Sequence, residues 1–134
     1  MAKKPFTPIP PMAELPPAEE INVREILDRY LSGEIDLICV LGPTASGKTR
    51  YAVRLAREIN EILCIHPDGQ PAITSCPSGC KGAEIISADS RQVYRGMDIG
   101  TGKDLSEYEE IPYHLMDIVA PGTKYNIFEY QRDF

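Results

Sequence analysis

Eight residues, from Gly42 to Thr49, carry the clearest chemical signal in this chain. They match the phosphate-binding pattern G-x-x-x-x-G-K-[ST] at every fixed position. The two glycines let the backbone approach a phosphate closely, and the lysine adds a full positive charge. The threonine hydroxyl is suited to binding Mg²⁺ beside the phosphate. The motif therefore predicts a site for a diphosphate or triphosphate. Its residues are Gly42, Pro43, Thr44, Ala45, Ser46, Gly47, Lys48 and Thr49.

The segments on either side of this loop support its use as a binding site. Residues 35–41 form a short apolar run that predicts a buried parallel strand. Residues 50–59 carry apolar side chains at helical spacing, with arginines on the opposite side. Strand, loop and helix in this order would aim the loop N–H groups and the helix dipole at a phosphate. The reaction stays open, because kinases, NTPases and some transferases share this loop.

A second polar segment follows another predicted strand. Residues 83–88 are mostly apolar and run directly into Asp89, Ser90, Arg91 and Gln92. Ligands of open α/β sheets bind beyond the carboxyl ends of the strands, so we expect Asp89 to face the same crevice as the phosphate loop. A carboxylate there can accept a proton from a nucleophile or hold the water of a metal. The alternative is that Asp89 caps the turn that follows it.

The two segments together resemble a known family. GPTASGKT followed by ADSRQVYRGMDIGT is similar to tRNA dimethylallyltransferases, also called tRNA isopentenyltransferases. The resemblance continues through residues 111–118 and 125–133, and it covers residues 37–134 apart from one insertion. It implies an enzyme that transfers a dimethylallyl group from dimethylallyl diphosphate to N6 of an adenosine next to the tRNA anticodon, with release of diphosphate. The implied partners are dimethylallyl diphosphate and a tRNA anticodon stem-loop.

The resemblance also implies roles for individual residues. Asp89 corresponds to the general base, and Lys48 to a catalytic lysine on the diphosphate. Ser90, Arg91 and Gln92, together with Asp89, correspond to the stretch that contacts the target nucleotide in tRNA. The amide of Gln92 could pair with an adenine edge once the base leaves its stack.

Mg²⁺ is the expected cofactor. Thr49 is the first candidate ligand, since the motif places its hydroxyl beside the phosphate. Asp117 ends a third predicted strand and is a second candidate, although it could instead cap the turn toward residues 121–122. His114 lies in the same apolar strand and is expected to be a hydrogen-bonded core residue.

The predicted fold is α/β: a P-loop NTPase-like parallel sheet with flanking helices, truncated in this chain. Three strands are expected, at 35–41, 84–88 and about 113–119, whereas doubly wound sheets usually have more. The sequence reaches its last residue inside a helix that Asn126 and Glu129 start with capping-box spacing. We therefore interpret residues 35–134 as the N-terminal part of a P-loop transferase domain. Alone, the chain is expected to be marginally stable and inactive on tRNA.

Residues 1–34 lie before this domain. The first 17 residues hold six of the twelve prolines and are expected to be extended and disordered. Residues 22–31 predict a short amphipathic helix that Asn22 and Glu25 cap and Gly33 ends. It either packs on its own domain, which we favour, or docks a partner. No segment resembles a secretory signal or a membrane span, so we expect a cytoplasmic monomer without a membrane partner.

An insertion at about residues 61–82 separates the first helix from the second strand. Proline and glycine predict a loop or a small hairpin there. Cys64, His66, Cys76 and Cys80 could bind zinc, but their spacing is uncommon, and we favour an ordinary loop with reduced thiols. Cys39, in the first predicted strand, is expected to be a buried small residue.

Charge alone argues against an RNA-binding role. The chain has a formal net charge of −6 and a pI of about 4.9, whereas nucleic-acid-binding domains are usually basic. Lys48, Arg50, Arg54 and Arg57 form a basic cluster, but we favour a solvated helix face as the explanation of the three arginines. Most of the attraction for tRNA would have to come from other parts of the enzyme.

Three other functions are compatible with the phosphate loop. A small-molecule or nucleotide kinase would bind ATP there and transfer a phosphoryl group, but it would have no use for residues 89–92 as a block. An adenylate isopentenyltransferase would prenylate free AMP, ADP or ATP, and the Ser-Arg-Gln sequence at 90–92 favours the tRNA type instead. A non-enzymatic diphosphate binder is the third alternative.

Overall fold

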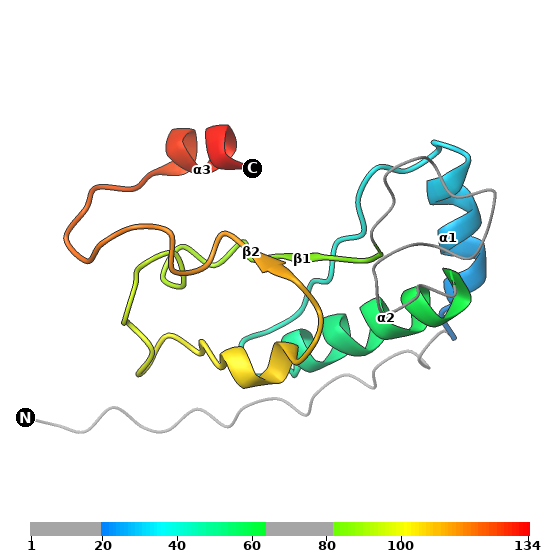
Figure 1. Cartoon of the computed structure of the whole chain (residues 1–134), viewed down its shortest axis with the longest axis horizontal. Helices are drawn as coiled ribbons and strands as arrows, with labels where there is room; N and C mark the ends of the chain where they lie inside the picture. The colour runs from blue at the N-terminus through cyan, green and yellow to red at the C-terminus, as the bar shows by residue number, and fades with distance from the viewer. Residues whose placement is uncertain (1–19, 64–81) are drawn as a thin grey trace, which may run out of the picture.

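A computed structural model of the chain describes residues 20–63 and 82–134 (Figure 1). The elements in chain order are α1 (Val23–Leu31), α2 (Lys48–Leu63), β1 (Ile85–Ile86), the 3₁₀ helix η1 (Leu105–Tyr108), β2 (Tyr113–His114) and α3 (Ile127–Asp133). The short parallel sheet lies between α1 and α3, and α2 runs below it in this view. The proline-rich segment 1–19 and the candidate zinc ligands Cys64, His66, Cys76 and Cys80 lie outside the described residues.

Helix α1 forms where its caps predict it. The Asn22 side chain accepts a hydrogen bond from the Glu25 N–H at 3.2 Å, and Gly33 has a φ of +76°, a conformation that favours glycine. Val23 and Leu27 are buried against α2. The prediction that this helix packs on its own domain is therefore confirmed.

Helix α2 is longer than the predicted 50–59, and it buries two of its faces. One face contributes to the first apolar cluster, which contains Val23, Leu27, Leu55, Ile59 and Leu63. The other contributes to the second apolar cluster, which contains Val53, Ala56, Tyr108, Ile111 and Met116. The helix therefore holds the N-terminal segment on one side and the region around η1 and β2 on the other.

The sheet confirms parallel pairing of the two later predicted strands. Ile85 pairs with Tyr113 and Ile86 with His114. The ladder is short because Leu115 and Asp117 have φ values of +60° and +54°, which turn the backbone out of the extended conformation. A parallel bridge between Tyr94 and Val119 resumes the pairing further along.

The prediction of a first strand at 35–41 is wrong for this structure. The segment has no strand partner among the described residues. Ile38 and Val40 pack against the first apolar cluster, whereas Leu41 is 87% exposed and Cys39 is exposed as well. A segment with apolar side chains on both of its faces becomes a buried strand only when neighbouring strands form hydrogen bonds with its backbone. Here only one face is covered, so the expectation of a buried Cys39 also fails.

His114 is hydrogen-bonded, as predicted, but it is not a core residue. Its Nε2 lies 2.6 Å from Oε2 of Glu84, and its side chain is 50% exposed. The strand that carries it is two residues long and pairs on one side only, which leaves this position open to solvent.

The α/β character and the parallel sheet are thus confirmed, while the P-loop NTPase class stays a prediction. Among residues 20–63 and 82–134, no helix is long and apolar enough to span a membrane.

Candidate functional site

The phosphate loop lies open to solvent at the start of a 16-residue helix. Residues 42–47 are exposed, and α2 begins at Lys48. A Cβ on Gly42 would come within 3.0 Å of the Ser46 Oγ, so the tight turn favours glycine. Gly47 has a φ of +80° and open space around it. An anion could therefore approach the backbone at the positive end of the α2 dipole.

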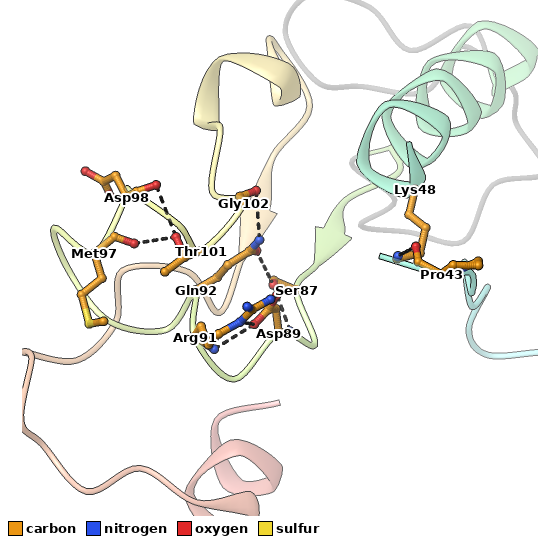
Figure 2. Close-up of polar contacts among 10 residues, drawn as sticks. All are labelled: Pro43, Lys48, Ser87, Asp89, Arg91, Gln92, Met97, Asp98, Thr101 and Gly102. Atoms are coloured by element: carbon orange, nitrogen blue, oxygen red, sulfur yellow. Dashed lines mark hydrogen bonds and ion pairs between the residues drawn. The ribbon is translucent and has the colours of Figure 1, made fainter. Parts of the chain in front are cut away.

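Lys48 and Asp89 line the same cavity, as the sequence predicts. The cavity has a volume of about 1220 Å³ and lies between segment 36–42, α2 and residues 82–92. The Lys48 Nζ donates a hydrogen bond across the loop to the carbonyl of Pro43 (Figure 2). The catalytic roles of both residues stay predictions, and lining one large cavity is compatible with them.

Asp89 both faces the cavity and caps its own turn, so the two interpretations of this residue are compatible. Its Oδ1 accepts the Arg91 backbone N–H at 2.9 Å and the Arg91 Nε at 3.2 Å, while Oδ2 lies 3.1 Å from the Arg91 guanidinium (Figure 2). These hydrogen bonds from Arg91, with a small contribution from Lys48, hold the pKa of Asp89 below its ordinary value. Asp89 is therefore ionised at neutral pH.

Gln92 is turned toward the protein interior. Both Gln92 and Ser87 are 8% exposed. The Gln92 Oε1 accepts a hydrogen bond from the Ser87 hydroxyl at 2.9 Å, and its Nε2 donates to the carbonyl of Gly102 at 3.3 Å (Figure 2). This arrangement argues against the predicted pairing of Gln92 with an adenine edge. Ser90 and Arg91, by contrast, are exposed.

Asp117 forms an ion pair with Lys103. The Lys103 side chain is completely buried, and its Nζ donates to Asp117, to Asp98 at 3.1 Å and to the carbonyl of Tyr94 at 2.8 Å. Burial alone would lower the pKa of Lys103, but its hydrogen bonds to the two carboxylates outweigh this and raise it. Lys103 occupies Oδ1 of Asp117, so the metal role of this residue stays a prediction that would use the second carboxylate oxygen.

Three residues of this site were not predicted from the sequence: Ser87, Lys103 and Tyr108. Tyr108 is 5% exposed and contacts α2 through the second apolar cluster. Burial raises the pKa of Tyr108, so it stays protonated. Ser87 had a detectable signal, since it is a polar residue within an apolar strand. Lys103 and Tyr108 had none, because their partners are distant in sequence.

The arginines of α2 are engaged within the protein. Arg57 pairs with Glu109 and, at 2.7 Å, with Glu110, and Arg50 lies 3.8 Å from Glu107. The guanidinium of Arg54 lies over the ring of Tyr51, 5.4 Å from its centre. The pairs of Arg50 and Arg57 connect α2 to residues 107–110, and all these contacts agree with the interpretation of a helix face rather than of an RNA-binding patch.

The donor set of the cavity fits a Mg²⁺ ion that arrives with a diphosphate. Within the described part of the chain, no group of three or more His, Cys, Asp or Glu side chains could hold a metal ion. The cavity offers the Thr49 hydroxyl, whereas both oxygens of the Asp89 carboxylate are already hydrogen-bonded to Arg91. Mg²⁺ typically keeps several waters and binds through substrate phosphates with one or two protein ligands, which matches this set.

Comparisons with known proteins agree on one family. Residues 92–134 match the family model described as IPP transferase. The tRNA dimethylallyltransferase 2 of Bacteroides fragilis (strain ATCC 25285) is 54% identical over 105 residues, which cover 75% of this chain and 27% of that protein. The tRNA dimethylallyltransferase 1 of Geotalea daltonii is 54% identical over 99 residues, or 74% of this chain and 25% of that protein.

Two solved structures are also similar. The tRNA delta(2)-isopentenylpyrophosphate transferase of Staphylococcus epidermidis is 35% identical with a TM-score of 0.50, over 69% of this chain and 23% of that one. The tRNA isopentenylpyrophosphate transferase of Bacillus halodurans is 38% identical with a TM-score of 0.50, over 68% and 23%. The chain therefore spans about a quarter of the length of the relatives it matches.

Proposed function

Over the segment that aligns with its relatives, this chain belongs to the tRNA dimethylallyltransferase family, and we propose that it supplies the diphosphate site and the general base of that activity. The reaction transfers a dimethylallyl group from dimethylallyl diphosphate to N6 of an adenosine next to the tRNA anticodon, and it releases diphosphate. The observation that carries the proposal is the single cavity that Lys48, Thr49 and Asp89 line together.

The phosphate loop would bind the diphosphate and stabilise it as it leaves. Negative charge grows on the departing oxygen while the bond to the allylic carbon breaks. Loop N–H groups at the start of α2 and the Lys48 ammonium would stabilise this charge, and Lys48 would exchange the Pro43 carbonyl for a phosphate oxygen. Thr49 would hold a Mg²⁺ ion, which neutralises further charge on a diphosphate. A P-loop NTPase-like fold suits this use as a diphosphate clamp, with no phosphoryl transfer.

Asp89 would accept the proton that the adenine amine loses. As the N6 nitrogen forms its bond to the allylic carbon, one N–H proton moves to a carboxylate oxygen of Asp89. The carboxylate is ionised and can accept this proton, although the hydrogen bonds from Arg91 that lower its pKa also make it a weaker base than an unpaired aspartate. Ser90 and Arg91 are exposed beside Asp89, and we propose them as the contacts to the target nucleotide. A cytoplasmic location and a monomeric state fit an enzyme that acts on tRNA.

The kinase alternative is not favoured. It leaves residues 89–92 without a role, whereas the family model matches from Gln92 onward. The names of the relatives specify tRNA, which favours a tRNA acceptor over a free adenine nucleotide.

The decisive experiment measures transfer of radiolabelled dimethylallyl diphosphate to an anticodon stem-loop RNA, to AMP and to ATP. We would test this chain and a chimera in which its aligned segment replaces the counterpart in the Bacteroides fragilis relative. The proposal expects the chimera to label the RNA alone. Labelling of AMP or ATP, or phosphoryl transfer from ATP, would contradict it.

A further inference from the structure

A buried hydrogen-bond path connects Asp89 to the glycine that precedes Lys103. The Asp89 N–H donates to Oγ of Ser87 at 3.3 Å, the Ser87 hydroxyl donates to Oε1 of Gln92 at 2.9 Å, and the Gln92 Nε2 donates to the Gly102 carbonyl at 3.3 Å. Figure 2 shows the four residues that the path connects: Asp89, Ser87, Gln92 and Gly102. All donors point the same way, so the three hydrogen bonds strengthen one another.

The path determines which way the Gln92 amide faces. With the amide turned over, its oxygen would face the Gly102 carbonyl, and two acceptors would repel each other. The donor must therefore point to Gly102 and the acceptor to Ser87. Because Ser87 and Gln92 are both 8% exposed, water cannot readily replace the hydrogen bond between them, whereas Gly102 is exposed.

Gln92 holds both backbone polar groups of Asp89. Its own N–H donates to the Asp89 carbonyl at 3.1 Å. Its side chain, through the Ser87 hydroxyl, holds the Asp89 N–H. One residue thus fixes the peptide groups on both sides of the Cα that carries the carboxylate, which restricts where the carboxylate can lie.

The far end of the path is anchored independently. Gly102 has a φ of +68° and precedes Lys103, whose buried ammonium is hydrogen-bonded to Asp98, Asp117 and the Tyr94 carbonyl. The carbonyl of Gln92 also accepts the Asp117 N–H at 3.0 Å. Asp89 is therefore linked through Gln92 to a buried ion pair rather than to a loose loop.

We propose that Gln92, acting through Ser87, is the positioning residue for Asp89, and that it does not read the acceptor base. The Asp89 carboxylate must meet a proton on the incoming amine, and an error of about 1 Å in such a geometry can cost about 10²-fold in rate. Exposed Ser90 is left to contact the nucleotide, and Arg91 could do so by giving up its ion pair with Asp89. This proposal rests on the proposed role of Asp89 as the base.

The first test separates positioning from base recognition by kinetics in the chimera described above. Gln92→Met keeps the length of the side chain and removes both hydrogen bonds. We expect a drop of about 10²-fold in the single-turnover rate at saturating stem-loop RNA, with the Kd for that RNA unchanged within about twofold. Ser87→Ala should act in the same direction, the double variant should be no worse than the more damaging single one, and Ser87→Thr should recover most of the rate.

The matched controls are Gln131→Met and Ser106→Ala, which change exposed residues of the same types that do not line the cavity. A contrary result is a Gln92→Met enzyme with its rate intact and a raised Kd, or one whose binding no longer discriminates the target adenine from inosine at that position. Either would show that Gln92 reads the base.

The second test uses this chain without substrate, so it does not depend on the activity. With ¹³C and ¹⁵N labels, we expect Gln92→Met and Ser87→Ala to shift the carboxyl and amide resonances of Asp89 and to speed exchange of its amide proton. Unchanged Asp89 resonances in both variants would overturn the positioning role. If these resonances shift while Asp89→Asn leaves transfer intact, the proposed function fails instead.

Discussion

The phosphate loop and the Asp89 turn (residues 89–92) line the same cavity, but they use their polar groups in opposite ways. Residues 42–47 are exposed and make few hydrogen bonds to the rest of the protein. The Asp89 turn is held by Ser87, by Arg91 and by the buried amide of Gln92. Polar groups that lack protein partners are available to a ligand, while groups that are already paired maintain a shape. One region is built to bind and the other to position.

Two lysines show the same contrast. The Lys48 ammonium lies beside the open loop and donates to the Pro43 carbonyl. The Lys103 ammonium is completely buried and has three acceptors around it, two of them carboxylates. Replacing either one removes the same charge. The comparison predicts that the first replacement weakens ligand binding and the second weakens the fold.

The largest expected effect is that of Asp89→Asn on turnover. The amide oxygen of the asparagine can still accept a hydrogen bond from the Arg91 N–H, but the amide cannot take the proton that the adenine amine loses. We expect the rate of transfer in the chimera to fall ~10²–10⁴-fold, with diphosphate affinity retained. Single-turnover transfer and calorimetry measure the two quantities. A rate within a factor of a few of the unmodified enzyme would mean that Asp89 serves only as the cap of its turn.

Lys103→Met should have the next largest effect, and it should act on stability. It removes the hydrogen bonds that the buried ammonium makes to Asp98 and Asp117, leaving two carboxylates close together. Charged hydrogen bonds contribute about 1.5–3 kcal/mol each, and Asp98 is 63% exposed and can regain water, so we expect a loss of about 3 kcal/mol. Urea unfolding of this chain measures it.

The matched variant for that experiment is Lys48→Met. Lys48 has one backbone acceptor at an open loop. The free energy of unfolding of the Lys48→Met chain should therefore stay within about 0.5 kcal/mol of that of the unmodified chain. Equal losses for the two lysines would remove the distinction between a binding region and a positioning region.

Lys48→Ala should lower the affinity for dimethylallyl diphosphate with Mg²⁺ by roughly 10- to 100-fold. This range corresponds to one lost charge-assisted hydrogen bond to a phosphate. Titration calorimetry on this chain is the measurement, and Lys124→Ala, at an exposed lysine outside the cavity, is the control. Equal affinity of Lys48→Ala and the unmodified chain would exclude the loop as the diphosphate site.

What the sequence predicted correctly was signalled locally. The helix at Lys48–Leu63 and the caps at Asn22 and Asn126 each depend on residues within a few positions of one another, while the phosphate-binding role of residues 42–49 stays a prediction. The capping box of Asn126 and Glu129 is present with both of its hydrogen bonds. Local geometry is sufficient to determine such features, so a single sequence reveals them.

What the sequence did not predict depends on distant partners. Residues 35–41 are apolar enough for a strand, but pairing is a property of two segments, and no described segment pairs with this one. Lys103 resembles any loop lysine until the fold brings Asp117 to it. Gln92 was assigned to the ligand because its chemistry suits an adenine edge. Its burial, which turns that chemistry inward, follows from the pairing of residues 92–95 with residues 117–119.

Arg91→Gln should have the smallest effect on stability. The pH dependence of this effect shows whether Arg91 supports the fold or is available to a ligand. The ion pair of Arg91 with Asp89 is partly solvated, with side chains 60% and 31% exposed, so we expect a loss of about 0.2–1 kcal/mol near neutral pH. Because Arg91 lowers the folded-state pKa of Asp89, this stability is present above the unfolded pKa of about 3.9 and is lost as the pH falls through the folded value. The Arg91→Gln chain and the unmodified chain should therefore become equally stable in acid, which urea unfolding across the pH range can follow.

A loss of stability well above 1 kcal/mol that persists in acid would mean that Arg91 supports the fold, as Lys103 does. A small loss that disappears in acid would leave Arg91 free to exchange Asp89 for a phosphate of the RNA.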